Sequence, residues 1–205
     1  MIKLMVLPLG VALAAGLGPW SETGPTGTTP TPRAAATTYA VDTVHSSGIF
    51  RVKHAGAAYF YGRFDHLEGD MMFDPEDLGA AKLEIRVKTE SVHTGAENRD
   101  KHLRGSDFLE AKQFPWATFT SSSVKAAGDD TFEVTGELEL RGVKKPVTMT
   151  ARHTGEGESR GTRRIGFETS FAIQRSDFGV SYGVKDGALG DEVTLTFGLE
   201  MVEKE

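Results

Sequence analysis

Apolar and polar residues alternate along most of the chain between Tyr39 and Glu203. The pattern is clearest over residues 82–88, 132–140 and 193–200, where apolar residues occupy nearly every second position. Successive side chains of a strand point to opposite faces, so the pattern predicts strands with one apolar and one hydrated face. A long series of such strands favours a closed antiparallel barrel or a sandwich.

The same alternation sets the expected boundaries of the elements. Thr94-Gly95-Ala96-Glu97 matches a capping box, so a short helix is expected to run to Arg104 and to stop at Gly105. Residues 155–161 and 185–190 are expected to be turns. The result is one barrel-like domain with a helix placed to cover one end. Its strands are predicted over residues 39–42, 49–54, 59–64, 69–73, 83–92, 118–124, 132–141, 147–153, 165–173 and 193–202.

The N-terminus has the pattern of an export signal, which we place at residues 1–18. Lys3 is its only charge, residues 4–17 are apolar apart from Pro8 and the glycines, and Ala12-Leu13-Ala14 offers a small-x-small cleavage pattern. An uncleaved anchor is the alternative, but the apolar run is shorter than the ~20 residues of a comfortable membrane span. We therefore expect a periplasmic or secreted protein that is soluble once the signal is removed.

Residues 19–38 are rich in proline, threonine, glycine and alanine. This composition cannot bury a core, so the segment is expected to be a disordered tether. The folded domain is expected to span residues 39–205.

Composition excludes several classes of function. The formal net charge of −6 argues against nucleic acid as a partner, because phosphate binding needs a basic surface. The chain of 205 residues has no cysteine, so it has no disulfide, no thiolate metal site and no thiol nucleophile. It also lacks the cysteine that a lipid anchor would modify.

Two patterns suggest catalysis or metal binding but are better explained otherwise. Residues 157–161 match the G-x-S-x-G nucleophile elbow, yet they lie among glycines and charges, which is typical of an exposed hairpin tip. His45 and His54 fall on opposite faces of their strand region, and no helix carries an H-x-x-x-H pair. We expect neither a metal site nor a catalytic residue, and we interpret His54 as a hydrogen-bonded interior histidine.

The run from Arg99 to Leu103 gives the short helix a dense charged face. One interpretation is a solvated face with ion pairs to the barrel. The other is a polar rim at the barrel mouth that orients a ligand headgroup, with Leu103 pointing inward as part of a movable lid.

Several short runs occur in an order that resembles one family. They are Tyr39-Ala40-Val41-Asp42, His45-Ser46, Phe50-x-Val52-x-His54, Gly62-x-Phe64, Arg99-Asp100-x-His102-Leu103, Asp107-Phe108-Leu109, Phe114-Pro115, Gly136-x-Leu138, Arg141-Gly142-Val143 and Arg175-Ser176-Asp177-Phe178-Gly179. Together they resemble the YceI-like lipid-binding family over nearly all of residues 39–202. The resemblance implies an all-β fold, an extended antiparallel lipocalin-like barrel with one short capping helix, in a bacterial and usually exported protein. It implies a polyprenyl lipid or isoprenoid quinone inside the barrel.

The leading hypothesis is a non-enzymatic protein that transports, stores or sequesters an apolar isoprenoid lipid, with no other cofactor and with transient membrane contact. One rival is a barrel enzyme that uses His54 or His45 with a carboxylate, although no acid–base pair stands at a suitable spacing. The other rival is a filled barrel that serves as a structural or adhesion module. The alternation of strand residues cannot by itself distinguish a filled from a hollow barrel.

The expected ligand-binding residues face inward from their strands or lie on the inner face of the helix. They are Phe50, Val52, His54, Phe60, Phe64, Met71, Phe73, Ile85, Val87, Leu103, Phe119, Leu138, Leu140, Phe171 and Phe197.

Overall fold

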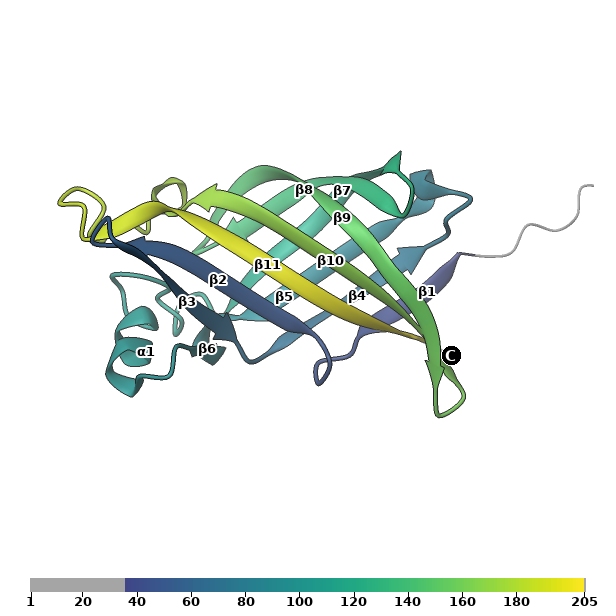
Figure 1. Ribbon diagram of the computed structural model, residues 1–205, viewed down its shortest axis with the longest axis horizontal. Helices are drawn as coiled ribbons and strands as arrows, with labels where there is room; N and C mark the ends of the chain where they lie inside the picture. Colours follow the sequence, from purple (N-terminus) through teal and green to yellow (C-terminus); the bar gives the residue numbers. More distant parts are fainter. Residues whose placement is uncertain (1–35, 205) are drawn as a thin grey trace, which may run out of the picture. The chain divides into compact units, whose positions relative to one another are not determined.

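A computed structural model describes residues 36–204, which form an antiparallel barrel with one α-helix, α1 (Glu97–Leu103), at one end (Figure 1). Short 3-10 turns η1 (Leu78–Ala80), η2 (Thr89–Ser91) and η3 (Arg175–Phe178) interrupt the strands. The strands are β1 (Thr37–Val41), β2 (Ser47–His54), β3 (Ala58–Phe64), β4 (Leu67–Phe73), β5 (Lys82–Lys88), β6 (Val92–His93), β7 (Trp116–Gly128), β8 (Thr131–Leu140), β9 (Val143–Ser159), β10 (Thr162–Gln174) and β11 (Leu189–Glu203).

The sheet closes because β11 has partners along both of its edges. The ring runs β1-β4-β5-β7-β8-β9-β10-β11, and β1 pairs again with β11, which gives eight strands around the barrel. β1 and β2 share one edge of β11. β1 pairs with residues 201–203, near the C-terminal end of β11, and β2 pairs with residues 189–198. β3 then pairs with β2 and with β6. The predicted antiparallel barrel with a single short helix is confirmed.

Two stretches differ from their predicted secondary structure. The strand expected over residues 83–92 is broken by η2, so that β5 pairs with β4 and the short β6 pairs with β3. The turn expected over residues 155–161 is wrong, because β9 continues to Ser159 and an ion pair between Glu156 and Arg163 joins it to β10. The tip, Arg160 and Gly161, has the left-handed φ angles of a tight hairpin, 55° and 78°. The G-x-S-x-G run therefore does end an exposed hairpin, as expected.

The predicted capping box of α1 is also wrong. Ala96 is the N-cap residue and has no side-chain capping bond. Thr94 instead donates from its backbone N–H, at 2.9 Å, and from its hydroxyl to the carboxylate of Asp100, which is buried within the helix. Arg104 closes the helix in a right-handed conformation, one residue before the expected stop. The carboxylate of Asp100, inside the helix, therefore binds the segment that leads into α1, where the sequence predicted a capping residue.

In Figure 1, β1 lies at the end of the barrel away from α1. Buried side chains of β1, β4 and β11 pack together there and close that end. Tyr39, Leu67 and Met201 are at most 2% exposed and form this core with Met71 and Ile165. Burial of apolar area is the main contribution to the stability of such a core. The packed end leaves the α1 end as the place where the interior can remain open.

Glycines on the inner face make room for phenylalanine rings. Phe50 is the direct cross-strand partner of Gly62, and a Cβ atom at position 62 would lie 2.3 Å from the ring. A Cβ atom at Gly136 would lie 2.5 Å from the Phe119 ring and 2.4 Å from a backbone oxygen. The rings therefore lie flat over the backbone of the neighbouring strand instead of filling the centre of the barrel.

The expected signal peptide (residues 1–18) and residues 19–35 of the expected tether lie outside the described residues. β1 begins at Thr37, two residues before the expected start of the domain at Tyr39. Within residues 36–204, no helix has the length and apolar composition needed to cross a bilayer.

The close approach of Phe50 to Gly62 predicts a packing defect in Gly62→Ala. The new methyl group should push the ring toward the barrel centre, at a cost of about 1–3 kcal/mol typical of overpacking, and so lower Tm. Gly157→Ala is the matched control, because nothing lies within 4 Å of its Cβ position. Equal Tm values for the two variants in thermal unfolding would contradict this account of the inner wall.

Candidate functional site

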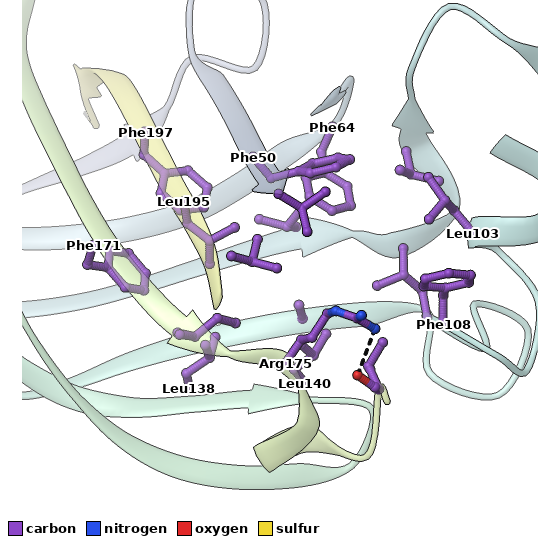
Figure 2. A pocket seen from close by; sticks show the side chains of 18 of the residues that line it. Phe50, Phe64, Leu103, Phe108, Leu138, Leu140, Phe171, Arg175, Leu195 and Phe197 are labelled. Atoms are coloured by element: carbon purple, nitrogen blue, oxygen red, sulfur yellow. Dashed lines mark hydrogen bonds between the residues drawn. The ribbon is translucent and has the colours of Figure 1, made fainter. Parts of the chain in front are cut away.

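The barrel encloses a cavity of about 620 Å³ that opens toward α1. This volume lies within the ~300–1,000 Å³ range of small-molecule sites. Inward side chains of β2, β3, β5, β7, β8, β9, β10 and β11 form its wall, and α1 and two loops complete it. Figure 2 shows Leu103, Phe108 and Arg175 toward one end and Phe171 and Phe197 toward the other. The wall is apolar over nearly its whole length.

All but two of the residues predicted from the sequence line this cavity. Their role in binding stays a prediction, but the structure brings them together around one space. They are Phe50, Val52, His54, Phe60, Phe64, Ile85, Val87, Leu103, Phe119, Leu138, Leu140, Phe171 and Phe197.

The two exceptions are Met71 and Phe73, which do not line the cavity. Met71 is buried in the core of the closed end. Phe73 packs its ring edge against Phe132 and Phe167, with ring centroids 5.5 Å apart in each pair. Alternation along a strand indicates which residues face inward, but it does not indicate how far along the barrel each one lies. Met71 and Phe73 face inward from β4, which runs through the packed end and not past the cavity.

His54 also differs from its expected environment. It lies at the end of β2, lines the cavity mouth and is exposed, instead of forming hydrogen bonds in the interior. The strand alternation predicted its face correctly, but it did not indicate that the barrel wall ends there.

Sequence reasoning missed two groups of lining residues. The first group follows the same alternation as the predicted residues, and inward parity would have found it: Leu83, Ala117, Met149, Thr169, Ile173, Val193, Leu195 and Leu199. The second group lies in the loops at the mouth, where no period exists, and at the first residue of β11: Phe108, Leu109, Val180, Tyr182, Ala188 and Leu189.

Arg175 holds the loop that forms one side of the mouth. Its side chain is 5% exposed, and it donates to the carbonyl oxygens of Val180 at 3.0 Å, Tyr182 at 2.8 Å, Gly190 at 2.9 Å and Leu189 at 3.3 Å. Burial lowers the pKa of Arg175 below its ordinary value. A buried guanidinium that binds only carbonyl groups keeps the loop in place without a carboxylate partner.

Arg141 joins the other loop to the first. It donates to the carboxylate of Glu110 at 3.1 Å and to the carbonyl oxygens of Phe108 at 3.3 Å and Gly179 at 3.0 Å. Arg104 likewise donates to two carbonyl groups of the segment between β5 and α1. The mouth is therefore shaped by loops that arginine side chains fasten at several points.

Two charged-face residues of α1, Arg99 and His102, bear on the two interpretations of this helix. Arg99 lies over the Phe60 ring, 4.2 Å from its centroid, and bonds to the hydroxyl and carbonyl oxygens of Thr94 at 2.8 Å each. His102 pairs with Asp107, with Nε2 and Oδ2 2.9 Å apart. Both Arg99 and His102 line the cavity, which matches the polar-rim interpretation.

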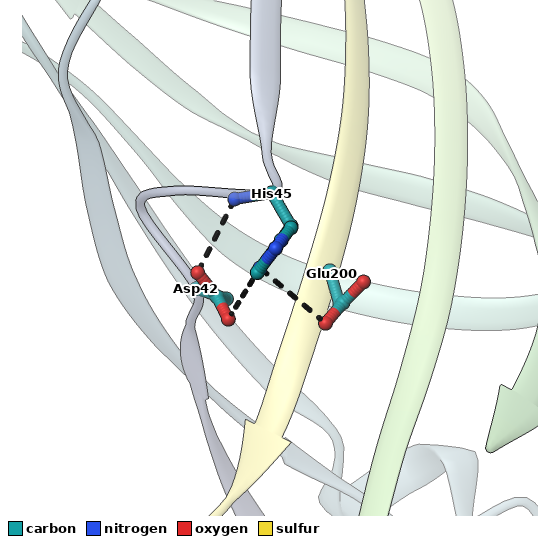
Figure 3. Close-up of side chains that lie close together, drawn as sticks. All are labelled: Asp42, His45 and Glu200. Atoms are coloured by element: carbon teal, nitrogen blue, oxygen red, sulfur yellow. Dashed lines mark hydrogen bonds and ion pairs between the residues drawn. The ribbon is translucent and has the colours of Figure 1, made fainter. Parts of the chain in front are cut away.

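A second cluster lies outside the cavity, where Asp42, His45 and Glu200 come together (Figure 3). His45 Nδ1 is 2.9 Å from Asp42 Oδ2. The Arg164 guanidinium donates to Asp42 at 2.6 Å and also to Glu200. Hydrogen bonds from His45 and from Arg164 hold the pKa of Asp42 well below its ordinary value. The cation that these two carboxylates bind is thus an arginine of β10.

Two histidines lie beside carboxylates, although residue spacing in the sequence indicated no acid–base pair. The turn after β1 joins Asp42 to His45, and the bend after α1 joins His102 to Asp107. The first pair does not line the cavity, and the ring of His102 stands edge-on to Phe108 and Tyr182, with centroids 5.0 Å away. Folding of the loops creates both contacts, so strand periodicity could not reveal them.

The barrel coincides with a known domain. A model of the YceI-like domain matches residues 39–201. "Protein YceI" of Escherichia coli O17:K52:H18 is 40% identical over 161 residues, which cover 78% of this chain and 83% of that protein. A "UPF0312 protein" of Azotobacter vinelandii is 38% identical over 175 residues, covering 84% and 90%.

Solved structures have the same architecture. BcnA of Burkholderia cenocepacia is similar with a TM-score of 0.72 at 28% identity, covering 78% of this chain and 98% of that one. The Campylobacter jejuni YceI protein has a TM-score of 0.66 at 32% identity, covering 75% and 90%. A polyisoprenoid binding domain from Saccharophagus degradans has a TM-score of 0.65, covering 83% and 100%, and its 20% identity bears on the fold alone.

The Asp42 cluster predicts a pH-dependent contribution to stability. Asp42 has a lower pKa in the folded than in the unfolded chain, so its contribution is present above about pH 4 and is lost as the pH falls below it. Asp42→Asn should therefore lower Tm at pH 7, and the difference from the parent should shrink below about pH 4. Glu158→Gln, at an exposed hairpin position, is the control. A difference that stays constant from neutral to acidic pH would refute the assignment.

Proposed function

Because the chain belongs to the YceI-like domain family, we propose that its barrel binds an isoprenoid-type lipid, a polyprenyl lipid or isoprenoid quinone, for transport, storage or sequestration. The observation that carries the proposal is the cavity of about 620 Å³ with an almost wholly apolar wall. The polyisoprenoid binding domain of Saccharophagus degradans, which has a similar fold, gives further support.

Hydrophobic burial explains why such a wall suits a prenyl chain. Each 100 Å² of apolar ligand surface removed from water contributes roughly 2.5 kcal/mol. A hydrocarbon chain offers no hydrogen-bonding group, so the strand portion of the wall needs shape and apolar surface but no polar partners. The phenylalanine rings that lie over Gly62 and Gly136 leave that space open.

The proposed activity is binding without catalysis. The His102–Asp107 pair at the mouth is the feature that would favour an enzyme. Against it, neither aspartate nor glutamate lines the cavity among the residues that the structure describes. A base would therefore have to act from the rim, far from most of a bound chain.

Substitutions inside the cavity test the proposal. Ile85→Glu should abolish retention of lipid and lower Tm, because an unpaired buried charge is costly. Leu195→Trp adds bulk without charge and should reduce retention while the strands stay folded. Lys82→Glu places a carboxylate on the outer face of β5, the strand of Ile85, where the residue is exposed, and is the control.

Organic extraction of each purified protein, followed by mass spectrometry, measures the retained lipid, and circular dichroism reports the fold. Parent protein without lipid that also fails to take up added prenyl lipid would contradict the proposal. So would undiminished retention in both cavity variants.

We further propose that the protein works outside the cytoplasm, after cleavage near Ala15. The support is the short apolar run and the Ala12-Leu13-Ala14 pattern that precede the barrel. N-terminal sequencing of protein from fractionated cells should find a chain that starts near Ala15 in the exported fraction. Full-length protein that retains Met1 on the membrane would refute this part of the proposal.

A further inference from the structure

Apart from Tyr182, the ionisable side chains that line the cavity are all basic. They are His54, Arg99, His102 and Arg175, and no carboxylate accompanies them among the lining residues described. The whole chain has 29 acidic residues against 23 lysines and arginines and 6 histidines, so a random sample of these side chains would contain both signs. The cavity therefore differs in charge from the protein that surrounds it.

These basic residues gather at the α1 end. His54 ends β2, Arg99 and His102 belong to α1, and Arg175 begins η3. Toward the other end, Figure 2 shows only apolar side chains such as those of Phe171 and Phe197. The cavity is thus amphipathic along its length, with an apolar interior and a cationic mouth.

Arg175 is the strongest of these features because its charge is buried and all of its hydrogen bonds go to carbonyl oxygens. Four of its five N–H groups donate to carbonyl oxygens, which leaves one N–H on Nη1. Among residues 36–204, the carboxylate that acts on its charge is that of Asp191, which forms no hydrogen bond with the guanidinium. The nearby Asp191 carboxylate binds the backbone N–H and hydroxyl of Ser176 instead. Carbonyl dipoles offset a buried cation only in part, so an anion brought to the mouth would gain from it.

Arg99 adds a second cation that no carboxylate neutralises. Its guanidinium bonds only to oxygens of Thr94 and lies over the Phe60 ring. By contrast, His102 lies within hydrogen-bonding distance of the Asp107 carboxylate, and the Asp100 carboxylate accepts hydrogen bonds from Thr94. Two permanent positive charges therefore remain available at the mouth.

We propose that the cavity prefers an apolar chain with an anionic oxygen headgroup, of the class of a prenyl phosphate, whose head lies at the α1 end against Arg99 and Arg175. This inference rests on the proposed binding of isoprenoid chains and selects among their headgroups. A neutral head can accept a hydrogen bond but cannot offset the charge, and a cationic head is repelled.

Three ligands with one chain and different heads test the preference: geranylgeranyl phosphate, geranylgeraniol and geranylgeranylamine. Titration calorimetry with the full mature protein should find the phosphate at least about tenfold tighter than the alcohol, because charge-assisted hydrogen bonds exceed neutral ones. The amine should bind most weakly. The alcohol binding as tightly as the phosphate would overturn the inference while leaving the proposed function intact. If the protein binds none of the three ligands, both the proposed function and this inference are wrong.

Substitutions on α1 locate the effect. Arg99→Gln should reduce the phosphate-to-alcohol affinity ratio several-fold, because both ligands lose the packing of Arg99 on Phe60 but only the phosphate also loses its charge partner. Lys101→Gln removes the same charge from the same helix at an exposed position outside the cavity, so the ratio should persist. Arg175→Gln should reduce the ratio as well, with Tm measured in parallel because the residue also holds its loop. An unchanged ratio in Arg99→Gln would contradict the placement of the head.

Discussion

Closure of the sheet through β11 is the constraint on which the rest of the structure depends. β11 pairs with β10 along one edge, and with β1 and then β2 along the other. With the ring closed, the backbone groups of its strands bond to one another, and the inner face can be apolar without leaving polar groups unsatisfied. The division of that edge between β1 and β2 also separates a packed end from a hollow one.

The hollow end persists because the residues around it hold the wall and the loops apart. Phenylalanine rings such as Phe50 lie over glycines of neighbouring strands, which keeps them close to the wall. Arg141 and Arg175 fasten the mouth loops through backbone carbonyl groups. Arg175 therefore has two effects at the mouth. It holds the loop in place, and it leaves a buried positive charge beside the cavity.

Strand periodicity predicted the barrel, the inner faces and most of the cavity wall, because the side-chain period of a strand is a local property. It could not predict depth along the barrel, and so Met71 and Phe73 were placed in the wall when they belong to the packed end. Residues in the mouth loops follow no period. The expected capping box does not form, because Thr94 binds the carboxylate of Asp100 instead. That carboxylate is buried, and burial of this kind depends on the folded structure and not on a local sequence pattern.

The central claim is that an apolar chain occupies the cavity with its head at the α1 end. A crystal structure of the protein isolated from its own cells tests this most directly. We predict continuous electron density for a methyl-branched chain that runs from beside Phe171 and Phe197 to a head next to Arg175. A cavity filled with ordered water, or collapsed by movement of its own side chains, would contradict the claim.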